Sequence, residues 1–250
     1  MKKLIPTILL IVLMLPGCIN DSRARLLRDI KEANRHLPIA YGSDDIFEKI
    51  EYDKELNEVF FIFATKNREI ITSCISCPEA VKRNISIFLS GEDYRPLLEE
   101  LVDAKTALTV SYRCLNTGEN VSLGFTNEQL IDISKMDLDE NQRASSLLKN
   151  TIDIYNSQYP VDMGDGMTMT EVIDDGKNVI IVIKIDDPSV DFDVVRDNIG
   201  EFKQEYNLKS DPHMASFIEL IKPMNRGLTF RYIDANSDKT IDLTYSPEEL

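Results

Sequence analysis

A stretch of 23 residues occurs twice in this chain, and it constrains the fold more than any other sequence feature. Leu108–Leu130 reads LTVSYRCLNTGENVSLGFTNEQL, and Leu228–Leu250 reads LTFRYIDANSDKTIDLTYSPEEL, in register without a gap. Both copies contain two runs in which every second residue is apolar, which is typical of a β-hairpin with one buried face. Thr126 and Gln129 then have the spacing of a helix-capping box, and the second copy keeps this spacing with Ser and Glu. Each copy is therefore expected to end in a hairpin and a helix start.

A second pair of matching segments precedes these hairpins. Residues 22–36 and 142–158 have the apolar periodicity of an amphipathic helix. Five residues of the first segment and its exit recur 122 positions later: Leu26, Ile30, Asn34, Pro38 and Gly42 match Leu148, Ile152, Asn156, Pro160 and Gly164. The prolines are expected to end the helices, and the glycines to adopt positive φ angles in the turns that follow.

Between these landmarks the sequence predicts further strands and helices. The expected strands are 46–52, 59–65, 167–173 and 179–185, and the expected helices are 78–89, 94–103, 198–208 and 212–221. The continuous apolar runs at 59–65 and 179–185 are typical of central strands buried on both faces. The predicted fold class is α+β, with two tandem repeats of an α-β-β-α-α-β-β module and antiparallel sheets with helices packed on one face. The predicted domains are 18–136 and 137–250, after a signal peptide at 1–17.

The first residues have the pattern of an export signal. Two lysines precede a twelve-residue apolar run, Leu4–Leu15, which is shorter than the ~20 residues that a membrane-spanning helix needs. The run ends in Leu15-Pro16-Gly17-Cys18, which resembles the lipobox of bacterial lipoproteins, although Pro16 stands where that family mostly has a small residue. Over residues 1–18 the resemblance implies cleavage before Cys18, a diacylglycerol thioether on its sulfur, and an N-terminal acyl group such as palmitate. The alternative is an ordinary secretory signal.

On this resemblance, the expected location is the bacterial cell envelope, with attachment to the membrane through the N-terminal lipid. Ile19, rather than aspartate, follows Cys18. In an organism with two membranes, the resemblance therefore implies sorting to the outer membrane, facing the periplasm.

The charge of the chain excludes some partners. Without Lys2 and Lys3, the 28 basic and 43 acidic residues become 26 and 43, a formal charge of −17. Such a surface repels phosphate backbones, so no nucleic-acid partner is expected. It also contains no polybasic patch for anionic lipid headgroups, so attachment to a membrane depends on the lipid.

Three cysteines follow Cys18, and they are the main candidates for chemistry. Cys74 and Cys77 form a CxxC motif directly before Pro78, where Cys77 is expected to cap a helix, and Cys114 lies in the first hairpin. A thiol at a helix N-terminus can be acidified, as in thiol oxidoreductases, but the chain lacks Trp and no βαβ pattern surrounds the motif. The alternatives are a structural disulfide, a redox-active pair and free thiols.

Other candidate sites are weaker. Asp234, Asn236 and Asp238 resemble part of an EF-hand calcium loop, but Lys239 replaces its glycine and Tyr245 its final glutamate. A polar β-turn accounts for the same residues. The two histidines, His36 and His213, do not have zinc-ligand spacing to the cysteines. The acidic pairs Asp44-Asp45, Asp174-Asp175 and Asp186-Asp187 are expected to be solvated turn residues.

The sequence therefore predicts a lipid-anchored envelope protein without a catalytic site or cofactor. Its expected role is to bind another envelope protein or a cell-wall ligand. Two alternatives remain open, namely a thiol–disulfide protein that uses the CxxC motif and a calcium-responsive binding protein.

Overall fold

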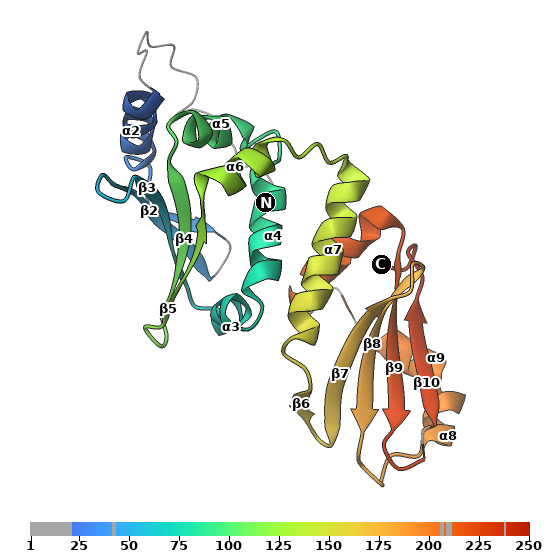
Figure 1. Cartoon of the computed structure of the whole chain (residues 1–250). Helices are drawn as coiled ribbons and strands as arrows, with labels where there is room; N and C mark the ends of the chain where they lie inside the picture. The colour runs from blue at the N-terminus through green and yellow to red at the C-terminus, as the bar shows by residue number, and fades with distance from the viewer. Residues whose placement is uncertain (1–21, 42–43, 206–207, 209–211, 238) are drawn as a thin grey trace. The chain divides into compact units, whose positions relative to one another are not determined.

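The computed structural model describes residues 22–41, 44–205, 208, 212–237 and 239–250 (Figure 1). The chain divides into two compact units, Met1–Leu138 and Asp139–Leu250. The fold is mixed α+β, because each unit combines one five-stranded sheet with helices. The predicted signal peptide and Cys18 lie outside the described residues.

The first unit is built on the sheet β1-β2-β3-β4-β5. Its elements are α2 (Ser22–Ala33), β1 (Ile39–Tyr41), β2 (Asp45–Asp53), β3 (Glu58–Thr65), α3 (Arg68–Ser76), α4 (Pro78–Leu89), α5 (Arg95–Asp103), β4 (Ala107–Cys114), β5 (Asn120–Phe125) and α6 (Asn127–Ser134). The sequence did not predict β1 and α3.

The second unit is built on the sheet β10-β9-β8-β7-β6. Its elements are α7 (Glu140–Asn156), β6 (Val161–Gly164), β7 (Met167–Asp174), β8 (Asn178–Ile185), α8 (Phe192–Asp197), α9 (Ile199–Glu205), α10 (Pro212–Ile221), the 3-10 helix η2 (Lys222–Met224), β9 (Gly227–Asp234) and β10 (Thr240–Tyr245). The sequence did not predict β6 and α8.

Each sheet is mixed, so the prediction of antiparallel sheets is wrong at one pair of strands in each unit. β3 runs parallel to β4, with Val59 opposite Leu108, and β8 runs parallel to β9, with Val179 opposite Leu228. The other pairs in these sheets are antiparallel. The reason is the long helical connection between the paired strands, which carries the chain back to the end of the sheet at which the first strand of the pair begins. The runs predicted as central strands, β3 and β8, are the middle strands of their sheets.

The core of each unit lies between its sheet and its helices. In the first unit Leu26 of α2, Leu98 of α5 and Leu130 of α6 are buried with Val59 and Leu108 of the sheet. In the second unit, the buried side chains from the helices are Leu148 of α7 and Phe217, Ile218 and Ile221 of α10, and those from the sheet include Val179, Ile181 and Leu228. The apolar alternation of the two hairpins thus supplies one wall of each core.

An asparagine attaches the first helix of each unit to the sheet. The Asn34 amide donates to the carbonyl oxygen of Ile50 at 2.7 Å and accepts from its N–H at 2.9 Å. Asn156 makes the same two bonds to Val172, at 2.9 and 2.8 Å. The edge strands β1 and β6 end before these positions. The asparagine side chains therefore satisfy backbone groups that have no strand partner on that side.

Two local predictions are confirmed. Gly164 has a φ of 83°, whereas its counterpart Gly42 lies outside the described residues. Thr126 caps α6: its side chain accepts from the N–H of Gln129, and the Gln129 side chain accepts from the N–H of Thr126.

Among the residues described, there is no helix with the length and apolar character that crossing a membrane requires.

Candidate functional site

The fold brings the segments that carry the three cysteines of the first unit to one end of its sheet. β3 and β4 are parallel, so their carboxyl ends lie at the same edge, where Thr65 is opposite Cys114. The helix α3 begins shortly after β3, carries Cys74, and contacts both β4 and β5. Cys77 links α3 to α4, since it follows the last residue of one helix and precedes the first residue of the other.

The first thiol of the CxxC motif, Cys74, is buried in the protein. Cys74 is 2% exposed, and burial raises the pKa of its thiol to about 11. It is therefore protonated near neutral pH, and a protonated thiol is a poor nucleophile. Cys77 occupies the predicted N-cap position of α4, but its side chain makes no capping hydrogen bond. All three cysteines are free thiols in this structure.

Cys114 accepts hydrogen bonds in the turn between β4 and β5. The Thr117 hydroxyl, and the backbone N–H groups of Thr117 and Asn116, lower the pKa of its thiol by bonding to the sulfur. Asp234 has the same place in the turn between β9 and β10, where it accepts from the N–H of Asn236 at 2.9 Å and from the Ser237 hydroxyl. Both residues thus accept bonds that shape a turn, which is a structural role.

The residues of the calcium-loop pattern have partners within the protein. The Asn236 amide donates to Asp186 at 3.3 Å, and Lys239 bonds to Asp193 at 2.7 Å. Asp238 lies outside the described residues. Within the described ranges, no group of three or more His, Cys, Asp or Glu side chains is arranged to hold a metal ion.

Two predicted acidic turns are observed as turns. Asp175 accepts from the N–H groups of Lys177 and Asn178, and Asp187 accepts from the N–H and hydroxyl of Ser189. These hydrogen bonds lower the pKa of both carboxyls.

The two histidines lie in different units. His36 is exposed and lies 3.9 Å from the Glu32 carboxylate. His213 belongs to α10, and its side chain is outside the part of the chain that the structure describes.

The sequence did not predict one group of ionisable residues, which lies between α2 and α5. Asp29 of α2 is 6% exposed, and Glu100 of α5 has a carboxyl oxygen that is buried. Burial, followed by the charge of Asp29, raises the pKa of Glu100 to about 7. A signal for this cluster exists in the sequence, because Asp29 lies three residues after Leu26 and four before Ala33, on the apolar stripe of its helix.

The hairpin strands of both units also carry pairs of polar side chains on the sheet face away from the core. Ser111 and Ser122 face each other across β4 and β5, with hydroxyl oxygens 2.8 Å apart. Across β9 and β10, Arg231 bonds to both carboxylate oxygens of Asp242, at 2.8 and 2.7 Å. These side chains alternate with the core residues of the same strands, so they lie on the other sheet face.

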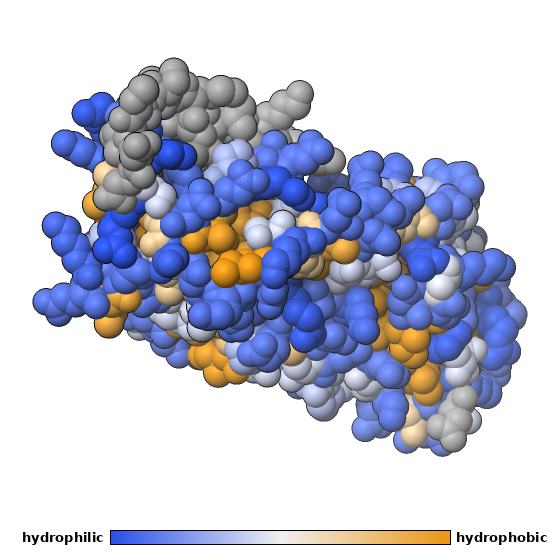
Figure 2. All heavy atoms as spheres, turned by 45° about the horizontal axis from the view of Figure 1, so that its top comes forward, coloured by the Kyte–Doolittle hydropathy of each residue, from blue (hydrophilic) through white to orange (hydrophobic). Residues whose placement is uncertain are grey.

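Large apolar side chains are exposed in several places. Figure 2 shows one face of the molecule, on which hydrophobic residues form separate patches among hydrophilic ones. The exposed large apolar residues are Leu56, Ile75, Phe88, Leu115, Tyr155, Val161, Met163 and Val194. They come from many different elements, so among the side chains that the structure describes no single helix or strand presents a long apolar stripe to solvent.

Comparisons of this chain with protein-family models, with curated proteins and with solved structures find no match.

Proposed function

We propose that this chain is a lipid-anchored protein of the bacterial cell envelope that binds another envelope protein or a cell-wall ligand and has no catalytic site. The observation that carries the proposal is the sequence at residues 1–18, where an apolar run of twelve residues ends in Leu15-Pro16-Gly17-Cys18. The run is too short to span a bilayer as a helix, so membrane attachment would depend on a lipid at Cys18.

The fold supports a binding role through its sheets. On the sheet face away from the core, Ser122 of β5 and Asp242 of β10 are exposed, so this part of each face is available to a partner. In the first unit this face carries small hydroxyl side chains such as Ser111 and Ser122, and in the second it carries the ion pair of Arg231 and Asp242. A partner that touches these positions would therefore meet a pair of hydroxyl groups in one unit and an ion pair in the other.

We also propose that the two units are tandem copies of one module, as the sequence match suggests. In both sheets the third and fourth strands in chain order run parallel. Val59 is opposite Leu108 in the first unit, and the residues 120 positions later, Val179 and Leu228, are opposite each other in the second. The asparagine bonds of Asn34 and Asn156 lie at the spacing of 122 found in the sequence. A single duplication of the module would explain both the matching strand pairing and the matching asparagine bonds.

The lipid anchor is tested by labelling with an alkyne fatty acid in a bacterial host. The full-length chain should take up the label and remain with the membrane fraction. Cys18→Ser should lose both the label and the membrane attachment, whereas Cys77→Ser should keep both. Absence of label on the wild-type chain, or its persistence on Cys18→Ser, would show that the chain is not lipidated at Cys18.

The binding face is tested with a photo-crosslinking amino acid in the anchored protein. Placed at Ser122 or Asp242, on the sheet faces, it should capture the same envelope component in intact cells. Placed at Glu99, which is exposed on α5, it should capture none. Equal capture from all three positions would count against a binding site on the sheet.

The thiol–disulfide alternative is disfavoured by the burial of Cys74. An aromatic disulfide reagent at neutral pH should modify Cys77 faster than Cys74, because the Cys74 thiol is buried and its pKa is about 11. Rapid and equal modification of both, with formation of a Cys74–Cys77 disulfide that a dithiol reduces readily, would instead favour a redox role. The calcium alternative would require that a chelator lower the melting temperature.

A further inference from the structure

The interface between α2 and α5 contains two carboxyl groups. Asp29 lies on the buried stripe of α2 together with Leu26 and Ile30. α2 packs against α5 and β2, and its apolar side chains belong to the core of the first unit. Glu100 comes from α5, and among the described residues no donor reaches its buried Oε2 atom.

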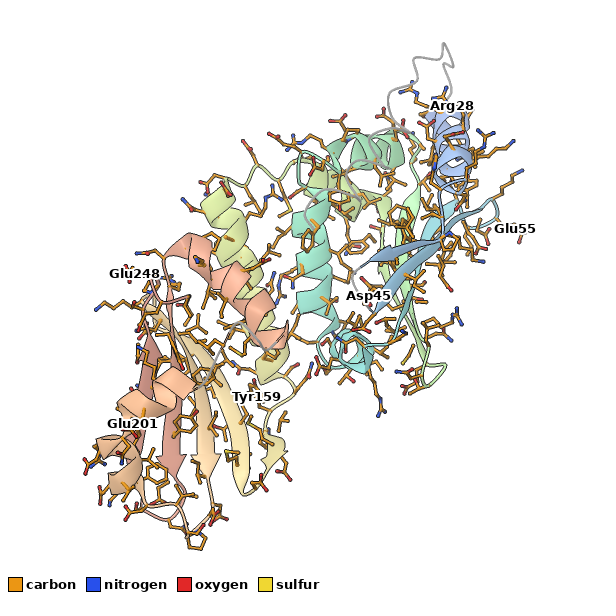
Figure 3. The ribbon with its side chains drawn as sticks, turned by 180° about the vertical axis from the view of Figure 1, so that it is seen from behind. Arg28, Asp45, Glu55, Tyr159, Glu201 and Glu248 are labelled. Carbon is orange, nitrogen blue, oxygen red and sulfur yellow. The ribbon has the colours of Figure 1, made fainter. Side chains whose placement is uncertain are left out.

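The basic residues of α2 offset these carboxyls only in part. Arg28 Nε lies 2.9 Å from Asp29 Oδ1, with its side chain about one-third exposed (Arg28 is labelled in Figure 3). Arg25 and Arg28 lower the pKa of Glu100, but burial and Asp29 raise it more, to about 7. The nearest cations therefore do not fully compensate for bringing the two carboxyl groups together.

Charged groups on the other elements packed against these helices are not among the causes that shift the pKa of Glu100. α6, which also packs on α5, carries Glu128 and Asp132, and Lys135 follows its last residue; all three are exposed. On β2, Lys49 pairs with Glu51, and Glu48 pairs with Arg113 of β4. The groups that act on Glu100 are Asp29, Arg25 and Arg28, which all come from α2.

Binding of one proton removes the repulsion between the two carboxylates at this interface. Two ionised carboxylates both accept and cannot donate, so side by side they repel each other and leave an oxygen without a donor. A protonated Glu100 can donate to Asp29, and a side-chain bond to Asp29 is among the causes that raise the pKa of Glu100. The docked interface therefore favours the state in which the pair holds one proton.

We propose that Asp29 and Glu100 form a proton-dependent latch, which keeps α2 docked on α5 while the pair holds a proton and loosens this docking when the proton is lost. Loosening separates the two carboxyls and exposes both to water. The device acts on the helix itself, and it does not depend on lipid attachment at Cys18.

The direction of the pH effect on the docking of α2 follows from the pKa of Glu100 in the docked and undocked states. Its ordinary value is 4.5, and in the docked state it is about 7. The docked state therefore binds more protons than the undocked state between these values. The stabilisation is fully present below about pH 4.5, decreases as the pH rises towards 7, and is lost above it.

The test is amide hydrogen exchange of the full chain in detergent, followed in peptides from α2. After correction for the intrinsic exchange rate, opening of α2 should increase by on the order of tenfold between about pH 5 and about pH 8, since one pKa unit corresponds to a factor of ten. This is less than the full shift allows, because Glu100 is partly exposed to solvent. Peptides from α7 serve as the internal control and should show no such increase.

Two variants separate the latch from a general effect of pH. Glu100→Gln retains a donor without a charge, so it should keep α2 closed at both pH values. Glu99→Gln removes an exposed carboxylate from the same helix and should leave the wild-type profile unchanged. If Glu100→Gln does not fold, Asp29→Asn removes the repulsion from the other side. A pH-independent opening of wild-type α2, or the same profile in Glu99→Gln and Glu100→Gln, would overturn the proposal.

Discussion

In the first unit Ser111 and Ser122 face each other across a hairpin, whereas the second unit has Arg231 and Asp242 at the positions 120 residues later. The backbone pairing is the same in both places, because Ser111 is opposite Ser122 and Arg231 is opposite Asp242 in antiparallel register. A sheet face exposed to solvent accepts either pair, since the strands are held by backbone bonds and by the core side chains on the other face.

The same contrast extends to the turns and the helices. Cys114 and Asp234 both accept hydrogen bonds in a hairpin turn, one through sulfur and one through a carboxylate. The latch pair of the first unit has no equivalent, because the matching positions in the second unit are Thr151 and Leu220. The contacts found in both units are those that hold the fold, and the contacts that differ are the candidates for function.

The largest expected effect comes from core positions that match between the two units. Leu101 and Ile221 are fully buried, one in each unit, at positions 120 residues apart. Leu101→Ala and Ile221→Ala should each lower the free energy of unfolding of their own unit by about 2–5 kcal/mol, because each removes buried methyl groups and leaves a cavity. Denaturant unfolding, with hydrogen exchange to assign the unit, measures the change.

The control for this pair is Leu56→Ala. Leu56 is 64% exposed, so its truncation should change the stability by less than about 0.5 kcal/mol. Equal loss of protection in both units after either core substitution would contradict the view that each unit has its own core.

The smallest expected effect concerns the polar pairs on the sheet faces. Arg231→Ala should cost about 0.2–1 kcal/mol at low salt and less at high salt, because a partly exposed ion pair is screened. Ser111→Ala removes a neutral bond, so its effect should not depend on salt. Thermal unfolding at low and high ionic strength distinguishes the two, and an equal salt dependence would count against the contrast between the sheet faces.

The sequence predicts many of the long elements well, because each has a clear apolar pattern, either a continuous run or a helical period. The strand expected at 59–65 is β3, Glu58–Thr65, and the helix expected at 78–89 is α4, Pro78–Leu89. β1 and β6, with three and four residues, are too short to show a period of two. The helix α3 contains the β-branched run Ile70-Ile71-Thr72, which weakens its helical signal.

Two features could not be read from the sequence for physical reasons. The parallel pairing of β3 with β4 depends on which strands meet after a helical connection, and the apolar period of a strand does not specify its neighbour. The latch requires that Asp29 and Glu100, from helices distant in the sequence, come together. The position of Asp29 on an apolar stripe indicates a buried charge, but only the packing of α2 on α5 identifies its partner.

The most direct test of the claim that the units are copies of one scaffold is the amide exchange of Ile50 and Val172 in Asn34→Ala and Asn156→Ala. Each asparagine bonds to one of these two backbone positions in the same geometry. The account predicts that Asn34→Ala deprotects Ile50 alone and Asn156→Ala deprotects Val172 alone. Each variant should lose about 1–3 kcal/mol of stability, because a partly buried N–H and carbonyl lose their partner. Loss of protection at one position without a comparable loss at the other in the matched variant would contradict the claim.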